Sequence, residues 1–369
     1  MIVRLISKLS KIKIEMKLLI GASPSKIFHL KEFVKSLEKL GVKTKLVIDT
    51  DIYTGFPSKK ISNWFETKKK FNKLISEFEP DIIFVDRQHT LFDIAAVESK
   101  IPVFVHLRGD YWSEIKWAKE TLYKGFVRKF VIKIKEKRAE KCFNDSTVIL
   151  PICNYLENIV KNHYPNKNTH VLQSGITSSR WYSTTGMNLK HPCVGILQGA
   201  VIWGKTKEML ILEKVIKSLP NVMFYWAGDG PYRKKVLEKL EKFNNFKWLG
   251  PLEYPNKTRE FLSEIDIYGL VSGIDMSPLT VQEAQLMKKP VIVSNVGGVN
   301  ELIIDNETGF LINKGNPDEW IKKISLLIES KELRDTMGNK GRKFVEDNFS
   351  WDIIAEKFLK FIKEKNYHK

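Results

Sequence analysis

Short apolar runs alternate with longer amphipathic stretches along this chain, and this alternation constrains the fold more than any other feature. In the first half the apolar runs are KLLIGA, KTKLVID, DIIFVD and PVFVHL, and amphipathic stretches near 25–40, 62–78 and 90–99 separate them. Strands that alternate with helices of this length form βαβ units, whose parallel sheet is covered on both faces. The first half therefore predicts a Rossmann-like α/β domain.

The same rhythm restarts after Pro192. The strand candidates there are CVGILQG, VMFYWAGDG, FKWLG, DIYGLVS and PVIVSN, and the pattern is continuously helical from about residue 317. The segment 171–192 is rich in Ser, Thr and Gly, which makes it the best linker candidate. A length of 369 residues also favours two domains. We place them at 1–175 and 176–348, with a C-terminal helix at 349–369.

The net charge of +18 is unevenly distributed. The first 175 residues carry 32 Lys and Arg against 19 Asp and Glu, whereas the remainder carries 29 against 24. A basic half points towards phosphate-rich partners such as anionic lipid, nucleic acid or phosphorylated small molecules. A solvated, Lys-rich surface is the equally valid alternative. Three cysteines without metal-ligand spacing favour a reducing compartment over a disulfide framework.

The first fifteen residues, MIVRLISKLSKIKIE, are basic and amphipathic. They lack the apolar core and cleavage site of a secretory signal. They would either lie on a membrane surface or form an extension, in which case Met16 is the true start. No apolar run approaches the length of about 18 residues that a membrane span needs.

Ligands of open parallel sheets bind outside the carboxyl ends of the strands, so the loops after the strands matter most. Two successive α/β domains are expected to face a cleft at these ends. In GIDMSPLTVQEAQ, residues 273–285, Ser277 suits a helix N-cap and Pro278 the first helical position. The amides of Leu279 and Thr280 would then form an anion site at the positive end of the helix.

Two acids flank that helix start. Glu283 lies inside the helix and would accept hydrogen bonds from a diol, and Asp275 lies in the loop before it. A phosphate between hydroxyl-rich groups describes a nucleotide-sugar. Taken alone, these thirteen residues favour the alternative of a capped helix with two solvated acids.

The surrounding sequence resembles a known family. DMSPLTVQEAQLMKKPVIVSNVGGVNELIIDNETGFLINKGNPDEW looks like the donor-binding core of the family-4, or group 1, glycosyltransferases, in which two glutamates separated by seven residues precede an alanine, a Pro-Val strand and a Gly-Gly loop. YWAGDGPYRKKVLEKL and GRKFVEDNFSWDIIAEKFL are similar to further units of that family. The resemblance implies a GT-B fold, with two Rossmann-like domains facing a cleft and C-terminal helices closing back towards the first domain. It covers roughly 145–365.

The resemblance also implies roles for residues. The first domain would bind the acceptor and the second the nucleotide-sugar. Glu283 would hold the donor ribose, Asp275 the transferred sugar, and Lys205 the diphosphate as it leaves. The remaining donor-binding candidates are Ser277, Leu279 and Thr280 at the helix start, Gly199 before Lys205, Gly250 and Leu252 near the base, and Gly21 and Ala22 of the first domain.

The chain departs from the family pattern at two positions. The first acid of the pair is usually glutamate, and Asp275 is one methylene shorter. The usual basic residue after the glycine is absent, because Ala200 follows Gly199. The leaving group would then depend on Lys205, the helix N-terminus and another cation such as Arg108.

VFVHLRGDYW resembles the strand end of the first domain where the family often carries a catalytic histidine. His106, Arg108 and Asp110 are the candidates. A histidine near a strand end is also commonly a satisfied core residue.

The predicted function is a retaining, metal-independent hexosyltransferase that uses a nucleotide-diphosphate sugar and needs no cofactor. Two alternatives stay open: a non-catalytic sugar-nucleotide-binding protein and a GT-B sugar-nucleotide epimerase. The acceptor would be a glycan or a lipid-linked glycan. The segment 112–143 interleaves aromatic, aliphatic and basic residues, so as a helix it would lie either on anionic lipid or against the sheet. We expect a cytoplasmic protein, peripheral at a membrane under the first alternative, and no nucleic-acid partner.

Overall fold

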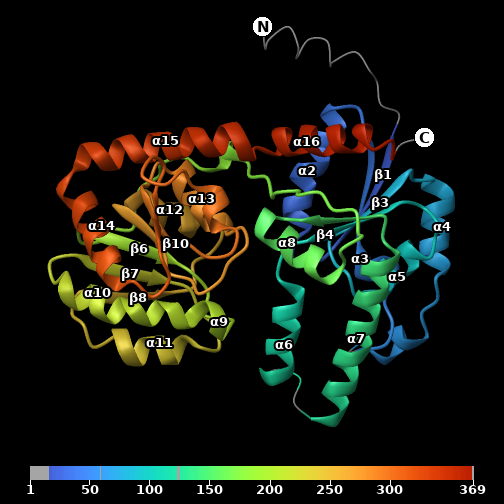
Figure 1. Ribbon diagram of the computed structural model, residues 1–369, viewed down its shortest axis with the longest axis horizontal. Coiled ribbons are helices and arrows are strands. Elements are labelled where there is room, and N and C mark those ends of the chain that lie inside the picture. Colours follow the sequence, from blue (N-terminus) through green and yellow to red (C-terminus); the bar gives the residue numbers. More distant parts are fainter. Residues whose placement is uncertain (1–15, 59, 122, 124, 368–369) are drawn as a thin grey trace, which may run out of the picture. The chain divides into compact units, whose positions relative to one another are not determined.

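The computed structural model describes residues 16–58, 60–121, 123 and 125–367. The chain divides into two compact units (Figure 1). The first takes in the chain up to Gly175 together with the segment from Trp351 onwards, and the second is Ile176–Ser350. The basic segment 1–15 lies outside the described residues. None of the described helices is long and apolar enough to cross a membrane.

The first unit is built on a five-stranded parallel sheet with the order β2-β1-β3-β4-β5. Strands β1, β3, β4 and β5 are almost fully buried because helices cover both faces of the sheet, whereas the edge strand β2 is partly exposed. The strands are β1 (Lys17–Ala22), β2 (Lys43–Ile48), β3 (Ile82–Val85), β4 (Val103–Leu107) and β5 (Val148–Pro151). The helices are α2 (Ile27–Lys39), α3 (Asp49–Ile52), η1 (Ile61–Phe65), α4 (Lys69–Phe78), α5 (Leu91–Val97), α6 (Tyr111–Thr121), α7 (Phe126–Asp145), α8 (Asn154–His163) and α16 (Trp351–Glu364).

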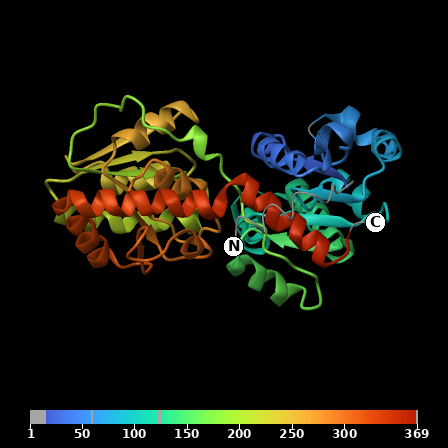
Figure 2. The same ribbon diagram turned by 90° about the horizontal axis from the view of Figure 1, so that it is seen from above.

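Helix α16 completes one face of this sheet. It packs beside α2 and over the strands (Figures 1 and 2). Phe358 of α16 is fully buried, with its ring centroid 5.5 Å from that of Phe33 and 6.0 Å from that of Phe84. The last helix of the chain is therefore part of the core of the first unit.

The second unit is built on a six-stranded parallel sheet with the order β11-β10-β9-β6-β7-β8. One face packs against α10, α11 and α14, and the other against α12, α13 and α15. The strands are β6 (Cys193–Leu197), β7 (Met223–Ala227), β8 (Phe246–Gly250), β9 (Ile267–Leu270), β10 (Val291–Ser294) and β11 (Phe310–Ile312). The helices are η2 (Ser178–Arg180), α9 (Trp203–Thr206), η3 (Lys207–Ile211), α10 (Leu212–Ser218), α11 (Arg233–Leu240), α12 (Asn256–Glu264), α13 (Leu279–Leu286), η4 (Val299–Leu302), α14 (Pro317–Glu329) and α15 (Lys331–Phe349).

The strand order reverses once in each sheet, at β1 and β3 in the first unit and at β6 and β9 in the second. Crevices that bind ligands open at the carboxyl ends of the strands at such reversals. The prediction of two Rossmann-like α/β domains is confirmed. The expectation of one helix over 112–143 is wrong, because two helices, α6 and α7, occupy that segment and Gly125 with φ 91° precedes the second.

Candidate active site

The loops that follow β6 and β9 meet at the point where the strand order of the second unit reverses. The amide of Gly273, after β9, donates to the carbonyl of Lys205 at 3.0 Å. A Cβ at position 273 would lie 2.1 Å from the carbonyl oxygen of Gly204, so only glycine permits this approach. The two loops are thereby held together at the carboxyl ends of the central strands.

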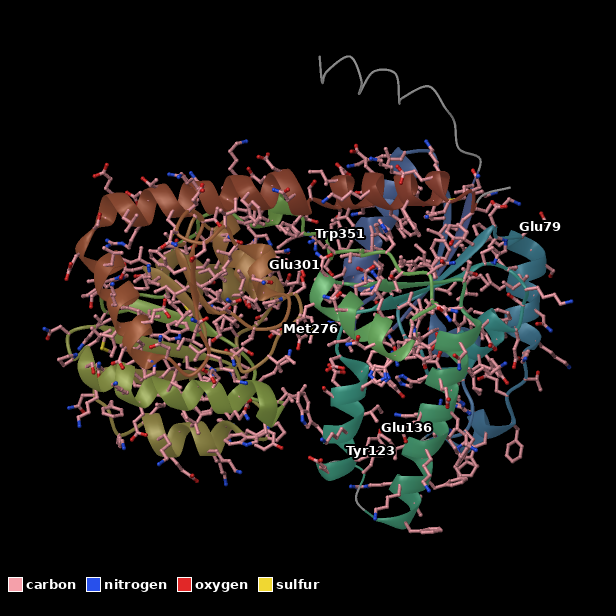
Figure 3. All side chains as sticks on the ribbon, in the orientation of Figure 1. Glu79, Tyr123, Glu136, Met276, Glu301 and Trp351 are labelled. Carbon is pink, nitrogen blue, oxygen red and sulfur yellow. The ribbon has the colours of Figure 1, made fainter. Side chains whose placement is uncertain are left out.

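This junction brings two of the predicted site residues together. Lys205 Nζ donates to Asp275 Oδ1 at 3.1 Å, and both side chains are partly exposed. The amide of Met276, labelled in Figure 3, donates to the same oxygen at 3.0 Å. The Asp275 carboxylate thus neutralises the cation that was predicted to meet a diphosphate.

The Gly-Gly loop after β10 holds Asp275 from the other side. The amide of Gly298 donates to the carbonyl of Asp275 at 3.0 Å. Gly297 has φ 58°, and a Cβ there would lie 2.0 Å from that same carbonyl oxygen. The glycines noted in the sequence therefore position the first acid of the pair.

Helix α13 starts one residue later than predicted. Its N-cap is Pro278, and the expected capping role of Ser277 is wrong, because among the described residues the buried Ser277 Oγ has no hydrogen-bond partner. The amides of Leu279 and Thr280 belong to the first turn, which no carbonyl of the helix can reach. The Thr280 hydroxyl accepts from Tyr268 at 2.7 Å. Within the described part of the chain, the amides of Leu279 and Thr280 have no hydrogen-bond acceptor, and they lie beside the unpartnered Ser277 hydroxyl.

Glu283 is buried one turn into α13. Its side chain is almost wholly removed from solvent, and burial raises its pKa to about 8, although a hydrogen bond with Tyr254 opposes the shift. The phenol of Tyr254 is the donor in that bond. Sequence inspection missed Tyr254 and Tyr268, because nothing local marks a tyrosine that pairs with a helix residue more than ten positions away.

The remaining donor-binding candidates of the second unit lie on loops at the carboxyl ends of β6 and β8. Gly199 follows β6, and the side chain of Ala200 is fully buried. Gly250 ends β8 with φ 76°, and Leu252 follows it.

Beside β8, Arg233 stacks over the Trp248 ring at 4.8 Å while it pairs with Asp229 at 3.0 Å. This aromatic and cationic group at the ends of β7 and β8 was not singled out from the sequence.

The first unit has its own polar cavity where its strand order reverses. The cavity measures about 200 Å³ and is lined by residues that include Ser23, Lys26, Asp86, His106 and Arg108. Ser23 Oγ donates to Asp86 Oδ2 at 3.3 Å, and Arg108 lies 3.4 Å from Asp86 Oδ1. Burial would raise the pKa of Asp86, but His106 and Arg108 beside it hold that pKa below its ordinary value. Burial and the Arg108 charge lower the pKa of Lys26.

Of the other predicted residues of the first unit, His106 lines this cavity, whereas Asp110, Gly21 and Ala22 are only sequence neighbours of lining residues. His106 is buried, its Nε2 lies 3.1 Å from the Leu172 carbonyl oxygen, and burial lowers its pKa. The Asp110 carboxylate accepts from the amide of Ser113 at 3.2 Å, as a helix cap does. Gly21 and Ala22 are the last two residues of β1. Asp86, which pairs with His106 and Arg108 in this cavity, was not predicted as a site residue. It ends the DIIFVD run, and its position directly after a strand could have identified it as a candidate.

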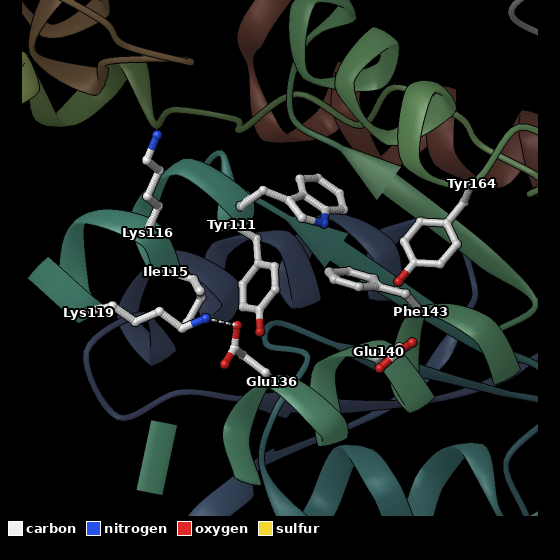
Figure 4. Close-up of a pocket in the computed structure, with 9 residues that line it drawn as sticks. Tyr111, Ile115, Lys116, Lys119, Glu136, Glu140, Phe143 and Tyr164 are labelled. Carbon is white, nitrogen blue, oxygen red and sulfur yellow. Dashed lines mark hydrogen bonds and ion pairs between the residues drawn. The ribbon is translucent and has the colours of Figure 1, made fainter. Parts of the chain in front are cut away.

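A larger pocket of about 400 Å³ lies between α6 and α7 (Figure 4). Its walls carry the aromatic rings of Tyr111, Trp112, Phe143 and Tyr164 and the carboxylates of Glu136 and Glu140. Among the described residues, the buried hydroxyl of Tyr111 has no hydrogen-bond partner. We call this space the α6–α7 pocket.

Comparison with known proteins identifies the second unit. Residues 205–344 match the family model of the group 1 glycosyl transferases. The second unit is a group 1 glycosyltransferase domain. The resemblance to the group 1 glycosyltransferases that was drawn from the sequence is thereby confirmed. The capsular polysaccharide biosynthesis glycosyltransferase CapM of Staphylococcus aureus is 28% identical over 233 residues, which are 62% of this chain and 50% of CapM. The chain spans about half the length of the curated relatives it matches.

Solved structures share the fold of both units. Sucrose-phosphate synthase of Thermosynechococcus elongatus is similar over 95% of this chain and 99% of its own, with a TM-score of 0.71 at 12% identity. HepE of Anabaena, solved in complex with UDP-glucose, is similar over 95% of this chain and 100% of its own, with a TM-score of 0.67 at 16% identity. The predicted GT-B fold class is confirmed.

Proposed function

We propose that this protein transfers a hexosyl group from a nucleotide-diphosphate sugar to a glycan or lipid-linked acceptor, with retention of anomeric configuration and without a metal ion. The observation that carries the proposal is the grouping of Lys205, Asp275 and Glu283 around the start of α13, where the strand order reverses. The group 1 family match and the UDP-glucose complex of the structurally similar HepE support a nucleotide-sugar donor.

The start of α13 would receive the diphosphate. The amides of Leu279 and Thr280 and the positive end of the helix favour an anion there, and the Lys205 ammonium adds a charge that stabilises the leaving diphosphate. Lys205 would exchange its bond with Asp275 for one with a phosphate oxygen. Donor binding would thereby free the Asp275 carboxylate at the moment when the sugar arrives.

The two acids would then accept hydrogen bonds from hydroxyl groups. Glu283 would hold the ribose diol. The two ribose hydroxyls would donate hydrogen bonds that favour the ionised carboxylate, and these bonds would oppose the rise in the Glu283 pKa that burial causes. Asp275 would hold the transferred sugar. Ser277 would contribute its unsatisfied hydroxyl, and Gly199, Gly250 and Leu252 would line the donor through their backbone groups.

The cavity of the first unit would contribute the other charged groups. We propose Arg108 as the cation that takes the place of the arginine missing at Ala200, and His106 as a group near the reacting sugar. Asp110 would orient the Arg108 loop by capping α6. Gly21 and Ala22 would approach the diphosphate as the family resemblance implies.

We propose that the α6–α7 pocket holds a saccharide of the acceptor. Carboxylates accept from sugar hydroxyls, and the Tyr111 hydroxyl would gain the partner that it lacks. If the acceptor is lipid-linked, the protein would be cytoplasmic and peripheral at the inner face of a membrane.

A lysine variant tests the catalytic role. Lys205→Ala should lower kcat/KM for transfer by about 10²–10³-fold, because it removes charge stabilisation at the leaving group. Lys214→Ala is the matched control, since Lys214 is also paired with an aspartate in this unit, Asp318 at 2.7 Å. Transfer that is undiminished in Lys205→Ala contradicts the proposed role.

A non-catalytic nucleotide-sugar-binding protein is the second candidate, and it is favoured by Ala200 and by the pairing of Lys205 with Asp275. A thermal-shift panel of nucleotide sugars detects binding, because a ligand that binds only the folded state raises the unfolding temperature. Binding without transfer to any glycan acceptor would favour this candidate, whereas binding with transfer supports the enzyme.

A further inference from the structure

Large exposed hydrophobic side chains are concentrated on one part of the first unit. Among the described residues thirteen such side chains are exposed, and six of them lie in two short segments, 61–65 and 126–130. They are Ile61, Trp64, Phe65, Phe126, Val127 and Phe130, which we call the aromatic surface. Phe126 is 90% exposed and Phe65 is 80% exposed. Single exposed apolar residues are ordinary, but contiguous ones mark interaction sites.

The two segments are adjacent in space although about 60 residues separate them in the sequence. The Phe56 ring joins them, because its centroid lies 4.9 Å from that of Trp64 and 6.3 Å from that of Phe130. Trp64 Nε1 donates to the Ser58 carbonyl at 2.8 Å, and Arg138 donates to the Phe56 carbonyl at 2.6 Å. These hydrogen bonds fix the Trp64 ring and the Phe56 backbone, and the Phe56 ring thereby joins the two segments.

The surroundings of the aromatic surface are positively charged. Lys60, Lys129 and Lys133 are exposed, and the sequence from 125 to 135 contains no acid. Of the nearest acids along the chain, Glu66 and Glu136 are each paired with a lysine outside the two segments, Lys70 and Lys119. A third acid, the exposed Glu120, lies six residues before Phe126.

Only the first turns of α7 present this surface. Ile132, Ala139 and Cys142 are buried, and so is Phe143, so most of the helix packs on its own unit. Figure 1 shows the pair α6 and α7 extending from the strands, and Figure 3 labels Glu136 on α7 and Tyr123 between the two helices.

We propose that the aromatic surface docks the protein on an anionic lipid bilayer. The rings would enter the boundary between headgroups and acyl chains, and the lysines would meet the anionic headgroups. Lysine is depleted in protein–protein interfaces, so three lysines around the rings favour lipid over a protein partner. The inference deepens the proposed peripheral location and does not depend on catalysis.

Flotation of the full chain with vesicles tests the proposal. Wild-type protein should float with vesicles that contain roughly 30% phosphatidylglycerol and much less with phosphatidylcholine alone. Phe65→Ser/Phe126→Ser should lower the partition coefficient at least about tenfold, because each ring loses its burial in the bilayer. Lys129→Glu/Lys133→Glu should abolish the preference for anionic vesicles. Ile304→Ser/Leu326→Ser, which changes exposed side chains of the second unit, should float as the wild type does.

Circular dichroism and donor-induced thermal shifts of every variant check that the fold is retained. Wild-type protein that does not float, or a Phe65→Ser/Phe126→Ser variant that floats equally well, overturns the proposal. The proposal is also overturned if the wild-type protein does not float but self-associates with rising concentration, and the Phe65→Ser/Phe126→Ser variant loses this self-association. Glycosyl transfer to a soluble acceptor is measured in parallel, so failure to bind vesicles remains distinguishable from failure of the proposed activity.

Discussion

The two acids of one motif have different surroundings in the second unit. Asp275 is partly exposed and bonded to Lys205, whereas Glu283 is buried and bonded to Tyr254. The sequence predicted the positions of both acids, since each lies at a fixed spacing from the start of α13. It did not predict their partners, because Tyr254 and Lys205 are distant in the chain and only the fold brings them near.

The raised pKa of Glu283 predicts a dependence of stability on pH in the unliganded protein. An unfolded glutamate ionises near pH 4.5, whereas the buried carboxyl keeps its proton up to about pH 8. The Glu283 carboxyl therefore contributes fully to the free energy of unfolding below pH 4.5, and this contribution is lost as the pH rises to about 8. The free energy of unfolding should fall by at most about 1.4 kcal/mol per pH unit in this range. Glu283→Gln should remove this slope from urea titrations between pH 5 and pH 8.

Exposed Glu238 provides the control for that experiment. Glu238→Gln should retain the wild-type pH profile. A Glu283→Gln profile that also coincides with the wild type would show that the buried carboxyl does not titrate between folded and unfolded states in the predicted range.

Elements were more predictable than the contacts between their ends. Apolar runs such as DIIFVD and PVIVSN identified the strands, because burial on both faces demands uninterrupted apolar residues. The break between α6 and α7 was missed, since aromatic, aliphatic and basic residues interleave on both sides of Gly125. The N-cap of α13 was predicted one residue too early. Ser277 before Pro278 has the local pattern of an N-cap, but in the folded loop its hydroxyl is buried and does not cap the helix.

The Gly-Gly loop yields a prediction at this scale. Gly297→Ala should destabilise the protein by about 1–3 kcal/mol and weaken donor binding, because φ is positive and the new Cβ would press against the Asp275 carbonyl. Gly315→Ala is the matched control, since φ is 75° there and a Cβ would meet nothing within 4 Å. Denaturant titration and donor thermal shifts measure both effects. Equal losses of donor binding in the two variants would argue against a role of this loop in placing Asp275.

At the scale of the whole molecule, the chain leaves the first unit at Gly175 and returns to it at Trp351. The core of the first unit is thus completed only by α16, after the second unit has been synthesised. Phe358 is the central contribution, because its ring packs among those of Phe33, Phe84 and Phe104. Local sequence pattern shows that α16 is amphipathic but cannot show which sheet its apolar face will cover.

This dependence predicts that the stabilities of the two units can be changed separately. Phe358→Ala should destabilise the first unit by about 3–5 kcal/mol, since the cavity lies in its core. In scanning calorimetry of the full chain, the transition of the first unit should move to lower temperature, while a nucleotide sugar should still raise that of the second unit. Phe126→Ala removes a ring that is 90% exposed and should leave both transitions unchanged. If Phe358→Ala also abolishes the shift induced by the donor, the donor site depends on the first unit for its stability. The grouping of Lys205, Asp275 and Glu283 would then be insufficient to bind the nucleotide sugar on its own.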